Sequence, residues 1–203
     1  MADQTPAKGR LIALEGASGA ELTRSAKRFS RHFCGGKAAA GVSRWDASNI
    51  FYELRRGDPS IPRPSPQTLL LLYASDLVFR LRWEIRPALE EGQCVIAAPY
   101  VESAIAFGKA SGLPRRWLVD LFQFAPKPEA CYVVKGNKEA SGGVGRPSEG
   151  YLEFCCATLS AGSPGWTSAE LRSKFIAYLD ALERRRGCQA VTEQLLAAAA
   201  TDR

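Results

Sequence analysis

Residues 10–28, RLIALEGASGAELTRSAKR, limit the fold of this chain more than any other stretch. They predict a buried strand over 11–14, a glycine-bearing loop over 16–22 and a helix that begins at Thr23. This order of elements is typical of a phosphate-binding loop, because backbone N–H groups and a helix N-terminus then surround an anion. We therefore interpret this segment as the scaffold of such a loop.

The loop departs from the P-loop pattern at the positions that carry charge. Laid on Gly16, the pattern G-x-x-x-x-G-K-[ST] requires Gly at 21, Lys at 22 and Ser or Thr at 23. The chain has Glu21, Leu22 and Thr23, so the hydroxyl for a magnesium ion remains but the cation for the phosphates does not. Alternatively, Gly16 and Gly19 only shape a tight turn and Thr23 is only a helix N-cap.

Strands and helices alternate along the rest of the chain. Apolar runs predict further strands at 39–43, 94–97, 130–134 and 187–191. Helical patterns fall at 47–56, 67–89 (which Pro87 bends or breaks), 101–107, 114–124, 151–159, 168–186 and 192–200. This alternation predicts an α/β domain with a parallel sheet of about five strands, covered by helices on both faces, and ligands at the carboxyl ends of the strands.

Composition excludes several classes of protein. The 203 residues fit one domain, with a short disordered N-terminus at 1–9 and a flexible lid-like segment at about 136–150. No apolar run approaches a membrane span, and residues 1–10 lack a signal-peptide core, which favours a cytoplasmic protein without a membrane partner. Six cysteines without C-x-x-C spacing, and one histidine, indicate reduced thiols rather than zinc. The net charge of +6 is spread along the chain, which argues against nucleic-acid binding.

Three stretches of the chain resemble the thymidylate kinase family of P-loop nucleoside-monophosphate kinases. LIALEGASGAELT is similar to the family's strand and E-G-x-D-G-x-G-K-[ST] loop. LLLLYASDLVFRLRWEIRPALEEGQCVIAAPYVESAIAFG is similar to L-L-F-x-A-D-R, I-x-P-x-L-x-x-G and D-R-Y-x-x-S-x-x-A-Y-Q in succession. The third is Gly112-Leu113 with the helix after it, and then Lys127-Pro128-Glu129 before a strand, where the family usually has Pro-Asp. The resemblance covers about two thirds of the chain and implies a three-layer P-loop kinase fold.

The resemblance also implies roles for single residues. It assigns ATP phosphates and magnesium to Gly16, Gly19 and Thr23, with Arg24 beside them. It assigns the acceptor nucleotide to four residues, Arg44 near its phosphate, Tyr73 as a base-stacking ring, Tyr100 and Ser103. Arg146 is the one arginine of the lid-like segment. The implied cofactors are therefore ATP and Mg²⁺, and the implied partners are a nucleotide and a second copy of the chain, paired through its long helices.

The family's charged motif residues are largely absent. Cationic positions of the family hold Leu22, Leu77 and Pro99, and a carboxylate position holds Ala98. Each lost cation removes a few kcal/mol of transition-state stabilisation, or about a hundredfold or more in rate. We therefore expect a catalytically impaired or inactive thymidylate kinase-like protein that retains nucleotide or anion binding.

Two alternatives stay open. One is an active kinase (ATP + dTMP to ADP + dTDP) that uses displaced residues such as Lys27, Lys37 or Arg146, and the other is a structural, dimerising module.

Overall fold

The computed structural model describes residues 9–33, 41–58, 60, 62–135, 150–160, 167–184 and 188–191. Four expectations concern residues outside these ranges. They are the state of residues 1–8, the lid-like segment up to residue 149 with Arg146, the displaced Lys37 and the helix at 192–200.

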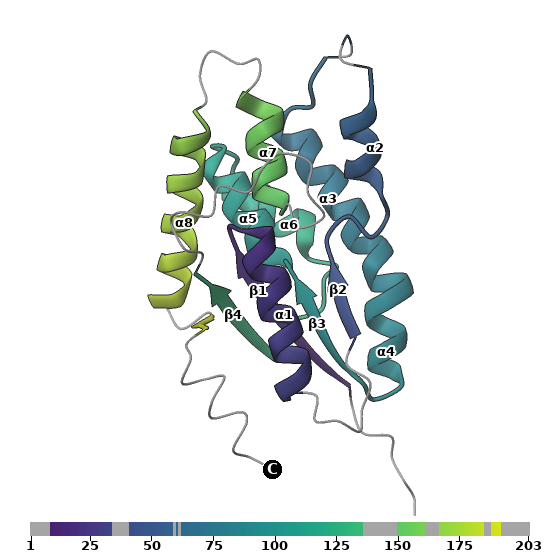
Figure 1. Ribbon diagram of the computed structural model, residues 1–203. Coiled ribbons are helices and arrows are strands. Elements are labelled where there is room, and N and C mark those ends of the chain that lie inside the picture. The colour runs from purple at the N-terminus through teal and green to yellow at the C-terminus, as the bar shows by residue number, and fades with distance from the viewer. Residues whose placement is uncertain are drawn as a thin grey trace, which may run out of the picture.

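Five parallel strands form one sheet in the order β2-β3-β1-β4-β5 (Figure 1). The strands are β1 Arg10–Gly16, β2 Gly41–Arg44, β3 Cys94–Ala98, β4 Ala130–Val134 and β5 Gln189–Ala190. The two central strands, β1 and β3, are buried along almost their whole length, which is why they read as unbroken apolar runs in the sequence. The parallel sheet of five strands is confirmed, including the short fifth strand.

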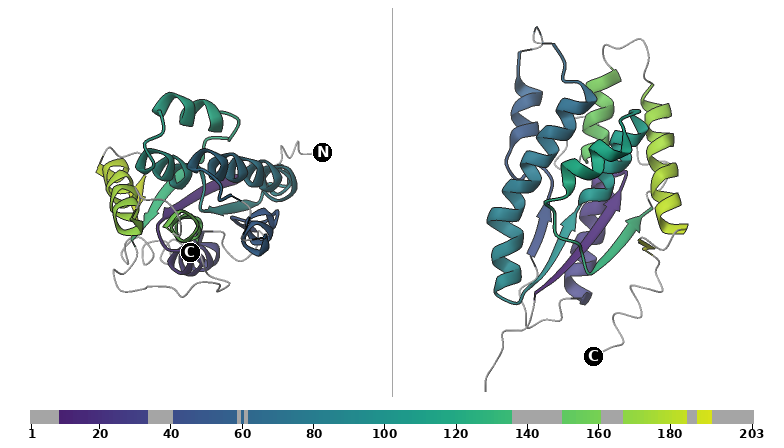
Figure 2. Two further views of the ribbon diagram at one scale, coloured as in Figure 1. Left: turned by 90° about the horizontal axis from the view of Figure 1, so that it is seen from above. Right: turned by 180° about the vertical axis from the view of Figure 1, so that it is seen from behind.

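Helices cover the sheet in two layers (Figures 1 and 2). Helix α1, Gly19–Phe33, lies on one face and packs on β1 and β3. The opposite face carries α3 Pro66–Arg80 and α5 Val101–Ala110, and α8 Ser168–Arg184 packs along α5. The remaining helices are α2 Ile50–Arg56, α4 Arg86–Glu90, α6 Arg115–Phe122 and α7 Tyr151–Ser160. Two separate clusters of buried apolar side chains lie under these layers, so the fold is the expected three-layer α/β arrangement.

The long helical pattern at 67–89 forms α3 and α4 joined by a π-helical segment, η1, at Leu81–Ile85. Pro87 lies just after this segment and lacks an N–H group, so it cannot bond the carbonyl one turn earlier, and its ring crowds that carbonyl. Widening the helix before the proline relieves the conflict without breaking the helix.

A disulfide joins Cys131 of β4 to Cys188, with the two Cα atoms 4.5 Å apart. The expectation that all thiols are reduced is therefore wrong for this pair. The cause is sheet register: Tyr132 pairs with Gln189, so the residues just before them in the parallel strands also lie opposite each other. The two cysteines are 57 residues apart, and their spacing alone did not reveal the pairing.

The carboxyl ends of β1, β2 and β3 meet at one edge of the sheet. Helix α1 begins there, and α7 lies beside its first turn (Figure 1). The connections of β1 and β3 leave toward opposite sides of the sheet, which is the arrangement that creates a binding crevice in open α/β sheets.

Candidate functional site

Helix α1 begins at Gly19, one turn before the expected start at Thr23. Only Ala17 and Ser18 separate β1 from α1, and the Ser18 hydroxyl accepts a hydrogen bond from Glu21 N at 3.4 Å. Serine is a favoured N-cap, and Ala, Glu and Leu are strong helix formers. This local sequence explains why the helix extends into the segment where a P-loop would stay open.

Leu22, which replaces the P-loop lysine, faces the core. Its side chain is 3% exposed and belongs to the apolar cluster under α1, with Ile12, Leu14 and Phe29. Gly16 makes room for it, since a Cβ at Gly16 would lie 3.3 Å from Leu22 Cδ2 and 3.0 Å from the Val134 carbonyl oxygen. Gly16 is therefore explained by close packing.

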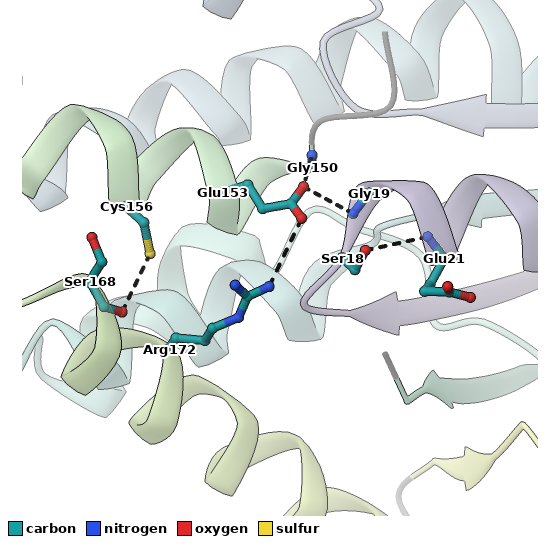
Figure 3. Close-up of polar contacts among 8 residues, drawn as sticks. All are labelled: Ser18, Gly19, Glu21, Gly150, Glu153, Cys156, Ser168 and Arg172. Carbon is teal, nitrogen blue, oxygen red and sulfur yellow. Dashed lines mark hydrogen bonds and ion pairs between the residues drawn. The ribbon is translucent and has the colours of Figure 1, made fainter. Parts of the chain in front are cut away.

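An internal carboxylate lies at the N-terminus of α1. Glu153 Oε2 accepts hydrogen bonds from Gly19 N at 3.2 Å and from Gly150 N at 2.6 Å (Figure 3). Its other oxygen, Oε1, lies 3.9 Å from Arg172 Nη2 on α8. The helix end that binds phosphate in a P-loop thus bonds a side chain of the same protein.

Backbone also covers the start of α1. Gly150, which precedes α7, packs so closely on Gly19 that a Cβ at Gly150 would lie 2.7 Å from Gly19 N. Glu21 contributes nothing here, because it forms an ion pair with Arg24 at 2.6 Å and its carboxylate points away from Glu153 (Figure 3). The carboxylate that contacts the first N–H group of α1 is therefore that of Glu153 rather than that of Glu21.

A second carboxylate, Glu15 at the end of β1, is fully buried at the start of α5. Glu15 accepts hydrogen bonds from the backbone N–H groups of Tyr100, Glu102 and Ser103, and from the Ser103 hydroxyl at 2.7 Å. Burial raises the pKa of Glu15 to about 7, although the bonds from Ser103 oppose that rise. The Ser103 hydroxyl also accepts a hydrogen bond from Gly16 N, so both hydrogen bonds of this hydroxyl are made to β1.

Tyr73 is buried in the core and is absent from the pocket lining described below. Its hydroxyl donates to the Tyr100 carbonyl oxygen at 2.5 Å, and its ring packs 4.5 Å from that of Tyr151. The Tyr100 hydroxyl in turn donates to the Pro126 carbonyl at 2.8 Å. These contacts favour a packing role for both tyrosines over the nucleotide contacts that the resemblance implies.

A pocket of about 600 Å³ opens at the carboxyl ends of β1, β2 and β3. Arg44 and Arg55 supply its cations, and Arg55 stacks with its guanidinium carbon 5.0 Å from the centre of the Phe154 ring. Four aromatic residues form much of the wall: Trp45, Phe51, Tyr52 and Phe154. Helix α1 contributes Gly19, Leu22 and Thr23, so Leu22 borders the pocket as well as the core, and Val42, Ala98 and Pro99 line the side of β2 and β3. The lining therefore offers aromatic faces and two guanidinium groups to a small ligand, beside two acids, Asp46 and Glu84.

Buried polar contacts fix the wall of this pocket. Asp76 accepts from the backbone of Asp46 and Ser48, and Asp46 accepts from Phe51 N at 2.8 Å at the start of α2. Burial raises the pKa of Asp46, against the bonds from the α2 backbone. On the other side, the fully buried Arg80 donates to the Ser43 and Pro99 carbonyls and so ties β2 to β3.

The described residues do not fit ATP with Mg²⁺. The Gly19 N–H is bonded to Glu153, position 22 carries a buried leucine, and Thr23 lies in the second turn of α1. Within the described ranges, no group of three His, Cys, Asp or Glu side chains could hold a metal ion. Nor does any helix in those ranges combine the length and apolar character needed to cross a bilayer.

Comparison with known proteins identifies the fold. A crystal structure of thymidylate kinase from Ehrlichia chaffeensis aligns with a TM-score of 0.58 at 15% identity, covering 91% of this chain and 93% of that one. A probable thymidylate kinase of Thermococcus gammatolerans is 30% identical over 135 residues, and one of Pyrococcus abyssi is 31% identical over 140.

The chain has a thymidylate kinase-like P-loop kinase fold. The matched stretch spans 65% of the length of each archaeal relative, and 62% and 63% of this chain. No protein-family model matches the sequence. The resemblance drawn from the motifs is thus confirmed for fold, and the chain's activity is a separate question.

Of the residues assigned from the thymidylate kinase resemblance, the pocket brings together Gly19, Thr23 and Arg44. It leaves out Gly16, Tyr73, Tyr100 and Ser103. Arg24 is exposed and paired with Glu21. The sequence analysis missed Glu153, Arg55 and the aromatic wall. One local signal existed, because a Glu at the third position of the helix that begins at Tyr151 is typical of a side chain that reaches back to its own N-cap.

Proposed function

We propose that this thymidylate kinase-like protein has lost phosphoryl transfer and binds a small aromatic anion, of the nucleoside monophosphate class, in the pocket at the ends of β1, β2 and β3. The observation that carries the proposal is the hydrogen bond from Gly19 N to Glu153 at 3.2 Å. A kinase of this fold needs that N-terminus for the phosphates of its donor. The relatives are named probable thymidylate kinases, so dTMP is the first ligand to test.

The charge of the pocket supports a ligand with few negative charges. Arg44 and Arg55 face two lining acids, Asp46 and Glu84. Asp46 is bonded to the N-terminus of α2, and Glu84 accepts from the Ser43 hydroxyl at 2.6 Å. Two guanidinium groups suit one phosphate, whereas a triphosphate requires more cations or a metal ion.

A coupled assay tests the loss of catalysis. Purified protein is given ATP, Mg²⁺ and a panel of nucleoside monophosphates, beside Thr23→Ala and the control Thr68→Ala at the exposed start of α3. We expect no turnover above the enzyme-free rate from any of the three. Conversion of dTMP to dTDP that disappears in Thr23→Ala and persists in Thr68→Ala would overturn the proposal and establish the active kinase instead.

Calorimetry tests the retained pocket. We expect dTMP to bind the wild type, and Arg44→Ala to weaken binding by about tenfold or more, since a charge-assisted bond to phosphate is lost. The control is Arg116→Ala on α6, where the side chain is 95% exposed. Binding that is equal in both variants would place the ligand elsewhere.

The dimerising role has an observation of its own. Helix α3 and η1 expose an apolar row of Leu71, Val78, Phe79 and Trp83, with Leu71 and Val78 each 50% and Trp83 62% exposed. The spacing of the α3 members places them on one face of the helix. We propose that this row pairs two copies of the chain. Trp83→Glu should convert a dimer to a monomer in light scattering, whereas Ile176→Glu, at an exposed apolar residue of α8, should not.

The proposal also includes a cytoplasmic location, because nucleoside monophosphates are present in the cytoplasm. The Cys131–Cys188 disulfide argues against it, because disulfides are rare in reducing compartments. Fractionation of cells that carry the tagged protein distinguishes a cytoplasmic location from a compartment in which disulfides persist.

A further inference from the structure

Two helix N-termini share a single carboxylate oxygen. Glu153 Oε2 bonds Gly150 N, just before α7, and Gly19 N, the first residue of α1. Both helix ends carry partial positive charge, and they approach closely because Gly150 lacks a side chain, whose Cβ would lie 2.7 Å from Gly19 N. Without an anion between them, these two ends would repel each other.

Arg172 completes the surroundings of this carboxylate. Its Nη2 lies 3.9 Å from Glu153 Oε1, and the Glu153 side chain is only 15% exposed (Figure 3). Helix α8, which carries Arg172, packs against α7. A carboxylate held by two backbone N–H groups and a guanidinium has the contacts that a bound phosphate oxygen would have at this place.

A role for Glu153 in α7 alone does not account for these contacts. A Glu at the third helical position commonly accepts from its own N-cap N–H, and the bond from Gly150 N is of that kind. That bond needs no partner from α1. The same oxygen nevertheless bonds Gly19, which is 134 residues away in the sequence.

We propose that Glu153 is an internal anion that closes the α1 N-terminus, so that Glu153 and an oligophosphate compete for the N–H groups at the start of α1. A phosphate bound there repels the Glu153 carboxylate, whose Oε2 then leaves Gly150 N as well as Gly19 N. The inference rests on the proposed function and specifies how the donor phosphates of a thymidylate kinase-like fold are kept out. Two predictions separate it from simple decay of the loop. Removing the charge of Glu153 uncovers phosphate binding, and a bound phosphate loosens α7 from α1.

The test is binding of pyrophosphate, without metal or nucleotide, to the full chain at low ionic strength, measured by calorimetry. Glu153→Gln keeps the shape and one acceptor oxygen but removes the charge. We expect it to bind pyrophosphate about tenfold or more tightly than the wild type, because two like charges a few ångströms apart repel by one to several kcal/mol. The matched control, Glu90→Gln, makes the same change of charge on an exposed residue of α4 and should bind as the wild type does.

Equal affinity in the wild type and Glu153→Gln would overturn the inference, and so would absence of binding in both. Since Glu153→Gln could also unfold, amide hydrogen exchange of the wild type at high pyrophosphate provides a second readout. We expect faster exchange at the start of α7, where the bond from Gly150 N is lost, and unchanged exchange there would contradict the competition. Both readouts are independent of turnover, so dTMP kinase activity could refute the proposed function without deciding this point.

Discussion

Replacing Leu22 by lysine restores the P-loop residue in the sequence but places it in the core. The wild-type side chain is 3% exposed, in the apolar cluster with Ile12, Leu14 and Phe29, and packs on Gly16. A lysine at this position has two choices. It keeps its whole side chain in the cluster and buries an unpaired ammonium group, or, because position 22 also lines the pocket beside Thr23, it turns into the pocket and gives up its apolar contacts.

Both positions of the lysine side chain lower the free energy of unfolding by similar amounts. Leaving the cluster loses the burial of a leucine side chain, about 1.5–3 kcal/mol, and burying the charge costs at least as much. We expect Leu22→Lys to lower the free energy of unfolding by about 2–4 kcal/mol, without gain of ATP binding. Leu22→Met, which conserves the volume, should lose less than about 1.5 kcal/mol.

Urea unfolding followed by tryptophan fluorescence and circular dichroism measures these differences, and calorimetry with ATP measures the binding. Suppose that Leu22→Lys is as stable as Leu22→Met and binds ATP when the wild type does not. Position 22 would then face the phosphates, and our account of the start of α1 would be refuted.

Three further predictions concern buried groups. Because burial raises the pKa of Glu15 from 4.5 to about 7, the folded protein binds this proton more tightly than the unfolded chain, so its stability contribution is full below about pH 4.5 and is lost as pH rises through 7. The free energy of unfolding changes by at most about 3 kcal/mol over this pH range. Glu15→Gln should remove this pH dependence in urea titrations. It should also lower the free energy of unfolding by about 1–3 kcal/mol, because its amide would face Glu102 N–H. Arg80→Met leaves the Ser43 and Pro99 carbonyls without their donor and should lower stability by about 2–4 kcal/mol, while Arg80→Lys restores only part because an ammonium group lacks the planar fork. Mass spectrometry after alkylation without reduction should find the Cys131–Cys188 crosslink, and two alkylated cysteines there would contradict it.

Much of the fold followed from local sequence. The apolar run at 94–97 became β3, the run at 130–134 became β4, and the alternation with helices predicted one parallel sheet. These predictions succeed because a strand buried on both faces reads as an unbroken apolar run, and because these runs are too short for a buried helix.

The start of α1 was predicted one turn late for a physical reason. The P-loop pattern led us to expect an open loop up to Thr23. Local preferences pointed the other way, since Ser18 is a good N-cap and the next residues are strong helix formers. Once the lysine is replaced by Leu22, burying that side chain stabilises the extended helix.

The candidate site was less predictable, because its contacts join distant segments. Glu153 meets Gly19 across 134 residues, and Glu15 meets Ser103 across 88. At Tyr73 the resemblance and the local pattern point to different roles, since the resemblance implies a stacking ring whereas the neighbours of Tyr73 along α3 are mostly apolar. Helical periodicity alone favours the core for such a residue, and the buried ring of Tyr73 agrees with it.

Three carboxylates share one arrangement at this edge of the sheet. Glu153 bonds the first residue of α1, Asp46 bonds the first turn of α2 and Glu15 bonds the first turn of α5. In each case an internal acid accepts from N–H groups at the start of a helix, where an anion is favoured by the positive end of the helix dipole. An anion that enters the pocket is therefore attracted by side-chain cations, of which Arg44 is an exposed member. Attraction of this kind is screened by salt, whereas donors fixed in a buried helix end are screened much less. Binding of a nucleoside monophosphate should thus weaken steeply with ionic strength, and a salt-independent affinity would mean that one of the three helix ends has exchanged its carboxylate for the ligand.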